Sequence, residues 1–510
     1  MKEKTPFLTR LLLIGMGLVI PCYLFTVGNV IFSPWPLYDR NRPALALLTA
    51  LCTAGLLLLL RRADRHEPFF ARHERKLLVA AAAIYFLVQM LLAQALRFTP
   101  KTDAEQCFTA AQLLVDTGTF GTNERSWIYF TRCSNNLGFL YALAAVFRFF
   151  GFFGWEDRFM QVVLVTSALF TLGLLCGARV CRRVGGVRAQ TRMLILCAGC
   201  LPLFYCTTEL YTDAFSLAFP TMAIYCFFRL REGKSRISRT LWALAFALVT
   251  FVGAQIRFTA IIASIACLIA LLMARRVRLT ALLAAALCAV FLPGTALKSA
   301  ETARHLDPED VASRSLPLLH YIAMGLPVQE DEGYGQYGDG GWYVFTTSFD
   351  DPAERDAALT TEIIDRIYYL RYPSRLLNMM SRKNLSTFGD GTFMLNEIIE
   401  ADDHEPDNAV KQIIFLQGAL YPAYYHLCTA MFLSQMLIAC LACAQAIRRR
   451  DVRGAPLFLA LVGIFIILCI WETRARYFFQ FQLVLLCAGA LCESGRIPVR
   501  FNTKRGASSD

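Results

Sequence analysis

The sequence predicts an all-α, polytopic membrane protein, and three observations lead to this fold class. Hydrophobic residues make up 56% of the 510-residue chain and charged residues only 18%, with a mean hydropathy of +0.45. A soluble protein carries about a quarter charged residues. Several apolar runs have roughly the 17–20 residues that cross a bilayer core as a helix. These runs are too long and too uniformly apolar for the strands of a membrane barrel.

The positive charges of the chain lie in short clusters between the apolar runs. The formal net charge is +12, which in a soluble domain would suggest a nucleic-acid partner. Lysine and arginine residues clustered in this way instead follow the positive-inside rule for cytoplasmic loops. We therefore expect no nucleic-acid partner. The clusters occur at residues 2–10, 61–76, 179–192, 229–239, 275–278, 448–453 and 496–505.

With every basic cluster in the cytoplasm, the apolar runs give about twelve membrane-spanning helices. Both termini are then cytoplasmic, and we expect a multi-pass protein of the cell (plasma) membrane. No small-residue cleavage site follows the first apolar run, so we predict no cleavable signal peptide. The predicted spans are residues 11–32, 44–60, 77–96, 159–178, 193–209, 214–228, 240–256, 258–274, 279–296, 414–445, 455–471 and 478–493.

One apolar segment, residues 137–150, does not fit this alternation. It is about fourteen residues long, short for a span, and contains Arg148. As a span it would move the basic cluster 179–192 to the outside. We therefore predict an interfacial or re-entrant juxtamembrane helix on the outer face.

The chain divides into three predicted regions. Residues 1–296 form a transmembrane core, with a first outer loop at 97–158 that holds the candidate catalytic residue. Residues 297–410 form one long extracytoplasmic loop, or cap, with a helix expected near 350–370. Residues 411–510 form the last transmembrane helices and a cytoplasmic tail.

Asp103 and Glu105 follow the third predicted span and begin an amphipathic stretch that ends near Gly118. An ionisable side chain at the edge of the membrane costs free energy unless it is paired with another group or has a function. Asp103 alone fits an N-cap well. The functional alternative is a general base that takes a proton from an incoming hydroxyl.

Three further clusters of charge share the outer side with Asp103. Glu209 and Asp213 form an acidic turn, in which Asp213 could simply cap the next helix. Arg257 stands between two apolar runs, either snorkelling to the interface or facing the bundle to bind phosphate. The connection between the last two spans carries two arginines although it lies on the predicted outer side, against the positive-inside trend. An anionic lipid headgroup is the natural partner for these arginines. The polar residues of this connection are Glu472, Arg474, Arg476 and Tyr477.

The cysteines give no metal or redox motif, because most of the 18 lie inside apolar runs, where they act as small hydrophobes. Cys107 and Cys133 share the first outer loop, where either a disulfide or two free thiols is compatible with the sequence. No P-loop, HExxH, GxSxG or dinucleotide fingerprint is present.

In order and sidedness, the outer segments resemble the C-type (GT-C) glycosyltransferase superfamily, in particular bacterial relatives of the protein O-mannosyltransferases and the lipid A aminoarabinose transferase. One departure is Cys133-Ser134, where many relatives have Tyr-Pro before Asn-Asn. The resemblance rests on Thr102-Asp103 with Gly118, Tyr129-Phe130, Asn135-Asn136, Leu210-Tyr211-Thr212-Asp213, Arg257-Phe258-Thr259-Ala260, His320-Tyr321-Ile322-Ala323-Met324-Gly325-Leu326, Lys383, Phe388-Gly389-Asp390-Gly391-Thr392-Phe393 and Arg476-Tyr477.

The resemblance implies an inverting hexosyl- or pentosyltransferase that uses a polyprenyl-phosphate sugar on the outer side of the membrane. Asp103 would be the base and Asp213 would assist it. Arg257, Arg474 and Arg476 would hold the lipid phosphate. The remaining substrate-binding candidates are Glu105, Glu209, His320, Lys383, Glu472 and Tyr477.

The acceptor would carry a hydroxyl group and be a protein, a glycolipid or a wall polymer, and membrane lipids are further partners. No organic cofactor is expected, and the clustered acids allow a divalent cation without requiring one. Two other functions stay open at this stage. One is a lipid-linked sugar flippase or transporter, and the other is a polymerase or ligase that uses diphosphate-linked donors.

Overall fold

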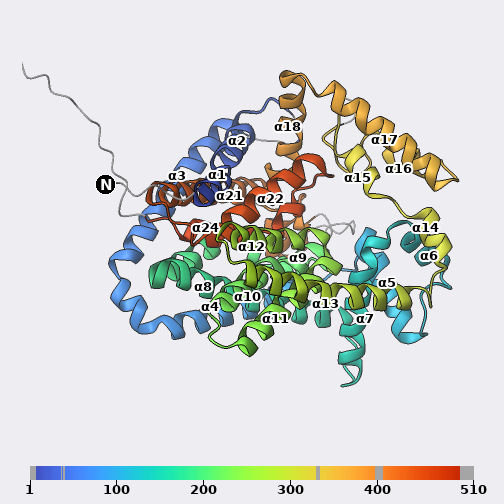
Figure 1. Ribbon diagram of the computed structural model, residues 1–510, viewed down its shortest axis with the longest axis horizontal. Helices are drawn as coiled ribbons and strands as arrows, with labels where there is room; N and C mark the ends of the chain where they lie inside the picture. Colours follow the sequence, from blue (N-terminus) through green and yellow to red (C-terminus); the bar gives the residue numbers. More distant parts are fainter. Residues whose placement is uncertain (1–6, 36, 38–40, 329–332, 397–405, 494–510) are drawn as a thin grey trace, which may run out of the picture.

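The structure, a computed structural model, describes residues 7–35, 37, 41–328, 333–396 and 406–493. Every regular element among them is a helix, which confirms the all-α prediction (Figure 1). The predicted basic residues Lys2 and Lys4 and the basic tail 496–505 lie outside the described residues. So do the cap segments 329–332 and 397–405.

The longer apolar helices pack side by side into one bundle. They share a single large apolar core that connects the N-terminal and C-terminal helices. The bundle helices are α1 (Phe7–Gly17), α2 (Val19–Phe32), α3 (Arg42–Arg65), α4 (Glu67–Ala95), α8 (Arg158–Ala198), α10 (Phe219–Glu232), α11 (Arg236–Ile256), α12 (Ile261–Met273), α13 (Val277–Thr302), α21 (Tyr421–Arg449), α22 (Ala455–Ile470) and α24 (Gln482–Ala490).

The remaining helices are mostly shorter and belong to the predicted outer loops or interrupt the bundle. Those of the outer loops are α5 (Thr102–Asp116), α6 (Glu124–Arg132), η1 (Ser134–Asn136), α7 (Leu137–Gly151), α14 (Pro308–Arg314), α15 (Leu318–Met324), η5 (Asp339–Gly341), α16 (Trp342–Thr347), α17 (Pro352–Tyr369), α18 (Pro373–Phe388) and α20 (Ala409–Ile414). The interruptions are η2 (Leu201–Phe204), η3 (Cys206–Thr208), α9 (Thr212–Ser216), η4 (Phe258–Ala260) and α23 (Arg476–Phe479).

Within the described part of the chain, seven helical segments are long and apolar enough to cross a membrane: α1 with α2, α3, α4, α8, α11, α13 and α21. Two more apolar helices, η4 with α12 and α22, are shorter. The predicted spans 193–209, 214–228 and 478–493 are not single helices but short pieces joined by turns. Pro202 lies in η2 of the first of these, and a proline removes a backbone donor that a continuous helix needs.

The basic cluster 179–192 was predicted as a loop between two spans. Its residues are helical, but the backbone has a sharp kink at Gly186, where the chain folds back so that Met193 contacts Gly177. The two predicted spans therefore do meet at this cluster, through a kink instead of a loop. Gly186 has φ +75°, a conformation that costs other residues energy. The arginines around this kink pair with acids of α3 and α4: Arg192 with Asp64 at 2.7 Å and Arg188 with Glu67 at 2.5 Å.

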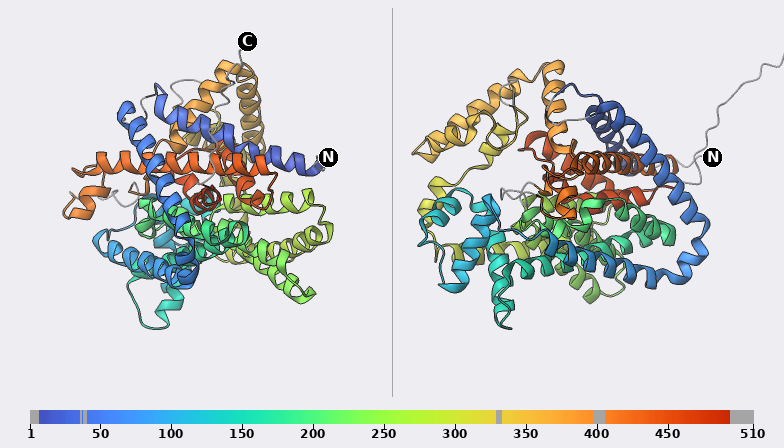
Figure 2. Two further views of the ribbon diagram at one scale, coloured as in Figure 1. Left: turned by 90° about the vertical axis from the view of Figure 1, so that its left-hand side faces the viewer. Right: turned by 180° about the vertical axis from the view of Figure 1, so that it is seen from behind.

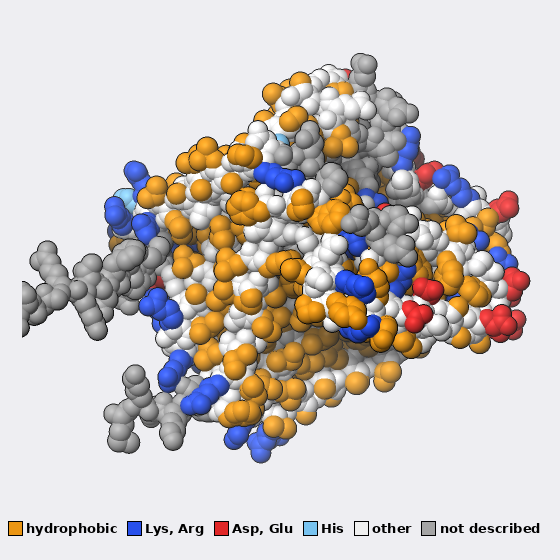
Figure 3. Space-filling view, turned by 90° about the horizontal axis from the view of Figure 1, so that it is seen from above, with side chains coloured by type: hydrophobic (Ala, Val, Ile, Leu, Met, Phe, Trp, Pro, Cys, Tyr) orange, Lys and Arg blue, Asp and Glu red, His pale blue; other side chains and the backbone are white. Residues whose placement is uncertain are grey.

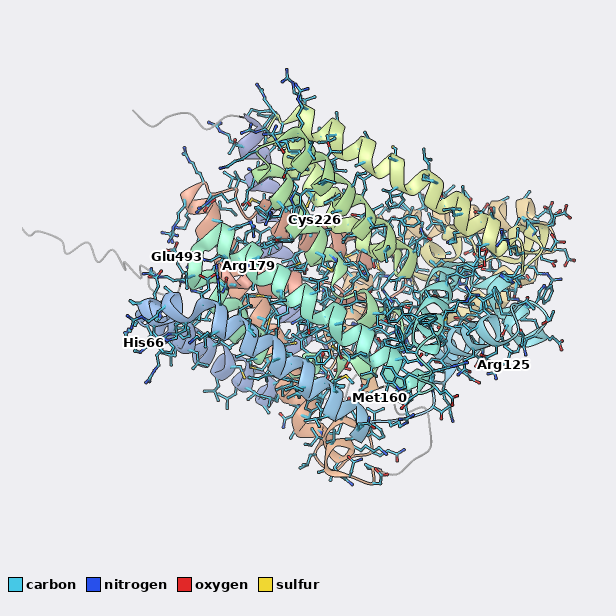
Figure 4. All side chains as sticks on the ribbon, turned by 90° about the horizontal axis from the view of Figure 1, so that it is seen from below. His66, Arg125, Met160, Arg179, Cys226 and Glu493 are labelled. Carbon is cyan, nitrogen blue, oxygen red and sulfur yellow. The ribbon has the colours of Figure 1, made fainter. Side chains whose placement is uncertain are left out.

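Charge separates along the molecule. In the face shown in Figure 3, Asp and Glu appear at one end, whereas Lys and Arg crowd the other end and a few lie near the acids. His66, Arg179 and Glu493 lie at one end in Figure 4, and Arg125 lies at the opposite end. The predicted inner and outer residues therefore occupy opposite ends of the bundle. Which end faces the cytoplasm stays a prediction.

The outer helices match the sequence analysis closely. α5 begins at Thr102, and α17 begins after Asp351, whose side chain accepts a bond from the Ala353 N–H at 2.9 Å. Both views of Figure 2 show α17 and α18 projecting at the edge of the bundle. α7 has 15 residues, about 22 Å, less than a bilayer core of about 30 Å. It is a helix as predicted, and its interfacial position stays a prediction.

Two close contacts fix the parts that carry the functional residues. A cluster of rings, Tyr23, Phe388, Phe465 and Phe478, joins α2, α18, α22 and α23, with Phe388 and Phe478 at 5.2 Å between ring centres. Gly138 of α7 lies directly against the backbone carbonyl of Gln255 in α11, where any Cβ would clash. The start of α7 is thereby fixed next to the end of α11.

Gly138→Ala should therefore destabilise the protein, because its new methyl group meets the Gln255 carbonyl in a tightly packed contact. Gly151→Ala is the matched control: it lies in the same helix, with nothing within 4 Å of an added Cβ. The denaturation midpoint in detergent should fall for Gly138→Ala and stay level or rise slightly for Gly151→Ala. Equal midpoints would show that the contact between Gly138 and the Gln255 carbonyl leaves room for a methyl group.

Candidate functional site

The centre of the site is a buried carboxylate between two arginines. Asp213, in α9, has no exposed side-chain surface. Its Oδ1 lies 2.5 Å from Nη1 of Arg257, and its Oδ2 lies 3.6 Å from Nε of Arg476. The Arg476 guanidinium also lies 5.5 Å from the centre of the Tyr211 ring. Three segments far apart in the sequence thus meet at one carboxylate.

Arg257 reaches this position because the chain leaves helical geometry there. α11 ends at Ile256, and Arg257 adopts extended backbone angles, φ −148° and ψ 112°. Its guanidinium donates to Oγ1 of Thr212 at 3.1 Å and covers the Tyr477 ring at 4.4 Å. Only 15% of the side chain is exposed. Arg257 therefore faces the bundle, and the alternative of a snorkelling arginine does not apply.

Asp103 is connected to the same cluster through Tyr211, whose ring lies beside the Arg476 guanidinium. It lies in the first turn of α5, while Lys101 occupies the cap position and makes no side-chain cap bond. The hydroxyl of Tyr211 donates to Oδ2 of Asp103 at 3.4 Å. Asn136 donates from Nδ2 to the hydroxyls of Tyr129 at 2.7 Å and Tyr211 at 3.1 Å. A tyrosine–asparagine chain thus orients the half-buried Asp103 carboxylate, which does not act as an N-cap.

Glu209 takes the capping role that the sequence allowed for Asp213. Its Oε2 accepts from the Ala214 N–H at 2.8 Å, at the start of α9. Burial, followed by the neighbouring Asp213 charge, raises the pKa of Glu209 well above its usual range, although Arg257 and Arg476 oppose this shift. Asp213 is thereby left to pair with the arginines.

The segment between α22 and α23 adds two further charged residues, Glu472 and Arg474, to the site. Glu472 is buried and accepts from the Tyr477 hydroxyl at 2.6 Å. Burial raises the pKa of Glu472, while the Tyr477 hydrogen bond and the charges of Arg476 and Arg474 lower it. Half-buried Arg474 therefore lies close enough to act electrostatically on this carboxylate.

The cap holds this segment from the other side. Lys383, in α18, donates to the carbonyls of Gly325 and Trp471, the latter at 2.7 Å. Tyr321 stacks on Trp471 with ring centres 5.1 Å apart and planes 9° apart. The Thr473 N–H donates to the Gly335 carbonyl at 2.9 Å. Burial lowers the pKa of Lys383 to about 7.

Two predicted substrate-binding residues lie away from this network. Glu105 points from α5 toward α6, where its carboxylate pairs with Arg125 at 2.9 Å. His320 is buried in the cap, with Nδ1 2.7 Å from Oγ1 of Thr346. Neither has a hydrogen bond or ion pair to the Asp103–Asp213 cluster among the described residues.

Cys107 and Cys133 are both free thiols in the structure. Burial, followed by the nearby Asp103 carboxylate, raises the pKa of Cys133 to about 12, so this thiol stays protonated. In the described ranges, no group of three or more His, Cys, Asp or Glu side chains is arranged to hold a metal ion. A divalent cation at this site would need substrate oxygens as additional ligands.

The residues that the sequence analysis did not assign to the site are Tyr129, Asn136 and Tyr211, which orient Asp103. All three belong to segments quoted for the family resemblance, so a signal existed. The resemblance indicated where these residues lie along the chain but not what they do. The hydrogen-bond partners of a phenol or an amide are set only by tertiary packing.

A protein-family model described as "conserved hypothetical integral membrane protein" matches residues 44–495. This range covers most of the chain. The chain belongs to this family. It is therefore an integral membrane protein, which agrees with the apolar helices long enough to span a bilayer.

No curated protein matches this integral membrane protein. Among solved structures, ArnT from Cupriavidus metallidurans, crystallised with bound undecaprenyl phosphate, is similar to it at 14% sequence identity. The similarity covers 83% of this chain and 78% of that one, with a TM-score of 0.35.

Asp213→Ala should destabilise this membrane protein by about 3 kcal/mol, because it leaves the buried Arg257 charge without its carboxylate. Glu105→Ala removes the partly exposed partner of Arg125 and should cost about 1 kcal/mol or less. Denaturation midpoints in detergent compare the two variants. Equal losses would contradict the role given to the Asp213 pair.

Stability should also fall in acid because of His320. Burial lowers the pKa of His320 from 6.5 to about 4, so only the unfolded chain takes up this proton between those values. Stability from this residue is present above pH 6.5 and is lost as the pH falls toward 4. His320→Gln should flatten the pH dependence of the denaturation midpoint in that window, whereas His66→Gln, at an exposed position, should not. Parallel curves for His320→Gln and the natural protein would contradict the prediction.

Proposed function

We propose that the chain is a membrane glycosyltransferase. It moves a sugar from a polyprenyl-phosphate donor to a hydroxyl acceptor at the outer membrane surface, with inversion at the anomeric carbon. The acceptor is a protein, a glycolipid or a wall polymer. The family match establishes only an integral membrane protein, so the proposal rests on the site and on the resemblance of its sequence segments to GT-C enzymes.

The observation that carries the proposal is the link between one carboxylate and two arginines through Tyr211. Its hydroxyl holds Asp103, and its ring lies beside the Arg476 guanidinium. Arg476 and Arg257 both face Asp213. A candidate base and a candidate phosphate site are thus held at a fixed separation by a single side chain.

The transfer reaction needs both the base and the phosphate site. Asp103 takes the proton of the acceptor hydroxyl, and the resulting oxygen attacks the anomeric carbon from the face opposite the phosphate. The bond from this carbon to the phosphate oxygen breaks, and polyprenyl phosphate leaves with one additional negative charge. Fixed cations aimed at such developing charge contribute several kcal/mol where water is scarce.

Arg257, Arg474 and Arg476 are the groups we assign to that phosphate. A guanidinium carries five donors, so an arginine bound to Asp213 retains donors for a phosphate oxygen. Glu209, Glu472 and Tyr477 are the groups we assign to sugar hydroxyls, which carboxylates and phenols bind well. We assign Lys383 an indirect role, because it holds the Trp471 backbone rather than facing the cluster.

The two alternative functions predict different behaviour. A transporter binds its substrate near the middle of the bundle, commonly at helix breaks related by an inverted repeat. Here the network lies at the breaks on one end of α11 and α22, and the sequence shows no internal repeat. A polymerase or ligase would share the geometry and differ in taking a diphosphate-linked donor.

Asp103→Asn should lower transfer by about 10²–10⁴-fold, the usual contribution of a general base. The measurement is transfer of a radiolabelled sugar from a polyprenyl-phosphate donor in proteoliposomes. Asp116→Asn is the control, since it lies at the other end of α5 and pairs with Arg158 at 2.5 Å, far from the network. It should retain full activity.

Full activity of Asp103→Asn would remove the proposed base. Accumulation of sugar in the vesicles without a covalent product would favour the transporter. Equal or better use of a polyprenyl-diphosphate donor would favour the polymerase or ligase.

A further inference from the structure

The corner where α17 meets α18 exposes an unusual surface. All eight residues from 371 to 378 are exposed. Large apolar and aromatic side chains dominate the corner and the helix ends on both sides of it. They are Ile364, Ile367, Tyr368, Tyr369, Tyr372, Leu376 and Leu377. We call this set the corner surface.

Two arginines lie on the tyrosines of the corner surface. The Arg371 guanidinium is 3.5 Å from the centre of the Tyr368 ring, and that of Arg375 is 4.0 Å from the centre of the Tyr369 ring. Their hydrogen bonds go to tyrosine carbonyl or hydroxyl oxygens. Among the described residues, no carboxylate forms an ion pair with either arginine. Tyrosine and arginine side chains beside exposed leucines are typical of a membrane–water interface.

The position of the corner surface relative to the membrane follows from the contact between α18 and α2. Asn384 donates to Oγ1 of Thr26 at 2.8 Å, and Asn29 donates to the Ser381 carbonyl at 2.8 Å. The two helices are therefore antiparallel, and α2 completes a segment long and apolar enough to cross a membrane. At about 1.5 Å per residue, Leu377 lies about 10 Å beyond Asn384 and the end of α2 lies about 9 Å beyond Thr26.

Leu377 is thus level with the last turn of α2, where Phe32 is 74% exposed. Arg375 lies farther out along α18, and Arg371 lies in the turn directly before this helix. The corner surface therefore continues the exposed apolar band of the bundle and ends in cations.

We propose that the corner surface rests on the bilayer, with Leu376 and Leu377 among the acyl chains. The tyrosines then lie at headgroup level, and Arg371 and Arg375 bind anionic lipid phosphates. An anionic membrane surface attracts arginine side chains that lie next to it. The contact ties the cap to the membrane through α18, the helix that carries Lys383 at its far end. This proposal does not depend on the glycosyltransferase function.

The test uses the full chain in vesicles of phosphatidylcholine and phosphatidylglycerol. Photoreactive p-benzoylphenylalanine replaces Leu377 in one variant, Tyr368 in a second and Glu354, exposed at the start of α17, in a control. After irradiation, intact-protein mass spectrometry identifies the adducts. We expect lipid adducts at Leu377 and Tyr368 and at least tenfold fewer at Glu354.

Replacing both arginines, Arg371→Ala with Arg375→Ala, should lower the share of phosphatidylglycerol among the Leu377 adducts. An unchanged share would overturn the assignment of the arginines to anionic headgroups. Absence of lipid adducts at both Leu377 and Tyr368, or equal yield at Glu354, would overturn the membrane contact. A covalent dimer as the main product would assign the surface to a second copy of the chain instead.

Discussion

The buried ion pair between Asp213 and Arg257 is the interaction on which the arrangement of the site depends. It joins α9 to the break after α11, and Arg476 on the other side of the carboxylate adds α23. Taking two charges out of water is costly, so such a pair is weak evidence of added stability. Its consequence here is geometric: two guanidinium groups are held where the chain alone would not place them.

The breaks in the bundle serve the same arrangement. Polar backbone inside a membrane protein is tolerated where it is buried in protein or lines a cavity. The extended Arg257 and α23, which begins at Arg476, are parts of the charged network, and the 3-10 turn η3 ends directly before Glu209. Interrupted helices thus supply directions for side chains that continuous spans would have pointed into lipid or into the apolar core.

Much of this could be predicted from the sequence because membrane topology limits the choices. Basic clusters fixed the alternation of spans, and alternation brought Asp103, Asp213, Arg257 and Arg476 to one side before any contact was known. α5 and α17 followed from local periodicity and capping. The sharp kink at Gly186 of α8 could not be predicted, since a kink in a helix and a loop look alike in composition.

Individual side-chain partners were beyond the reach of the sequence. Glu105 and Asp103 are two residues apart, yet one pairs with Arg125 and the other accepts from Tyr211. His320 had the chemistry of a ligand-binding residue but packs inside the cap against Thr346. In each case, the direction of the side chain is set by tertiary contacts.

A structure of the protein with a polyprenyl phosphate bound would show directly whether Arg257 and Arg476 hold the lipid phosphate. Phosphate density should lie within hydrogen-bonding distance of the Arg257 and Arg476 guanidinium groups, on the side of the network that faces Asp103. Phosphate density at another place on the bundle, with Asp213 and both arginines unchanged, would contradict this assignment.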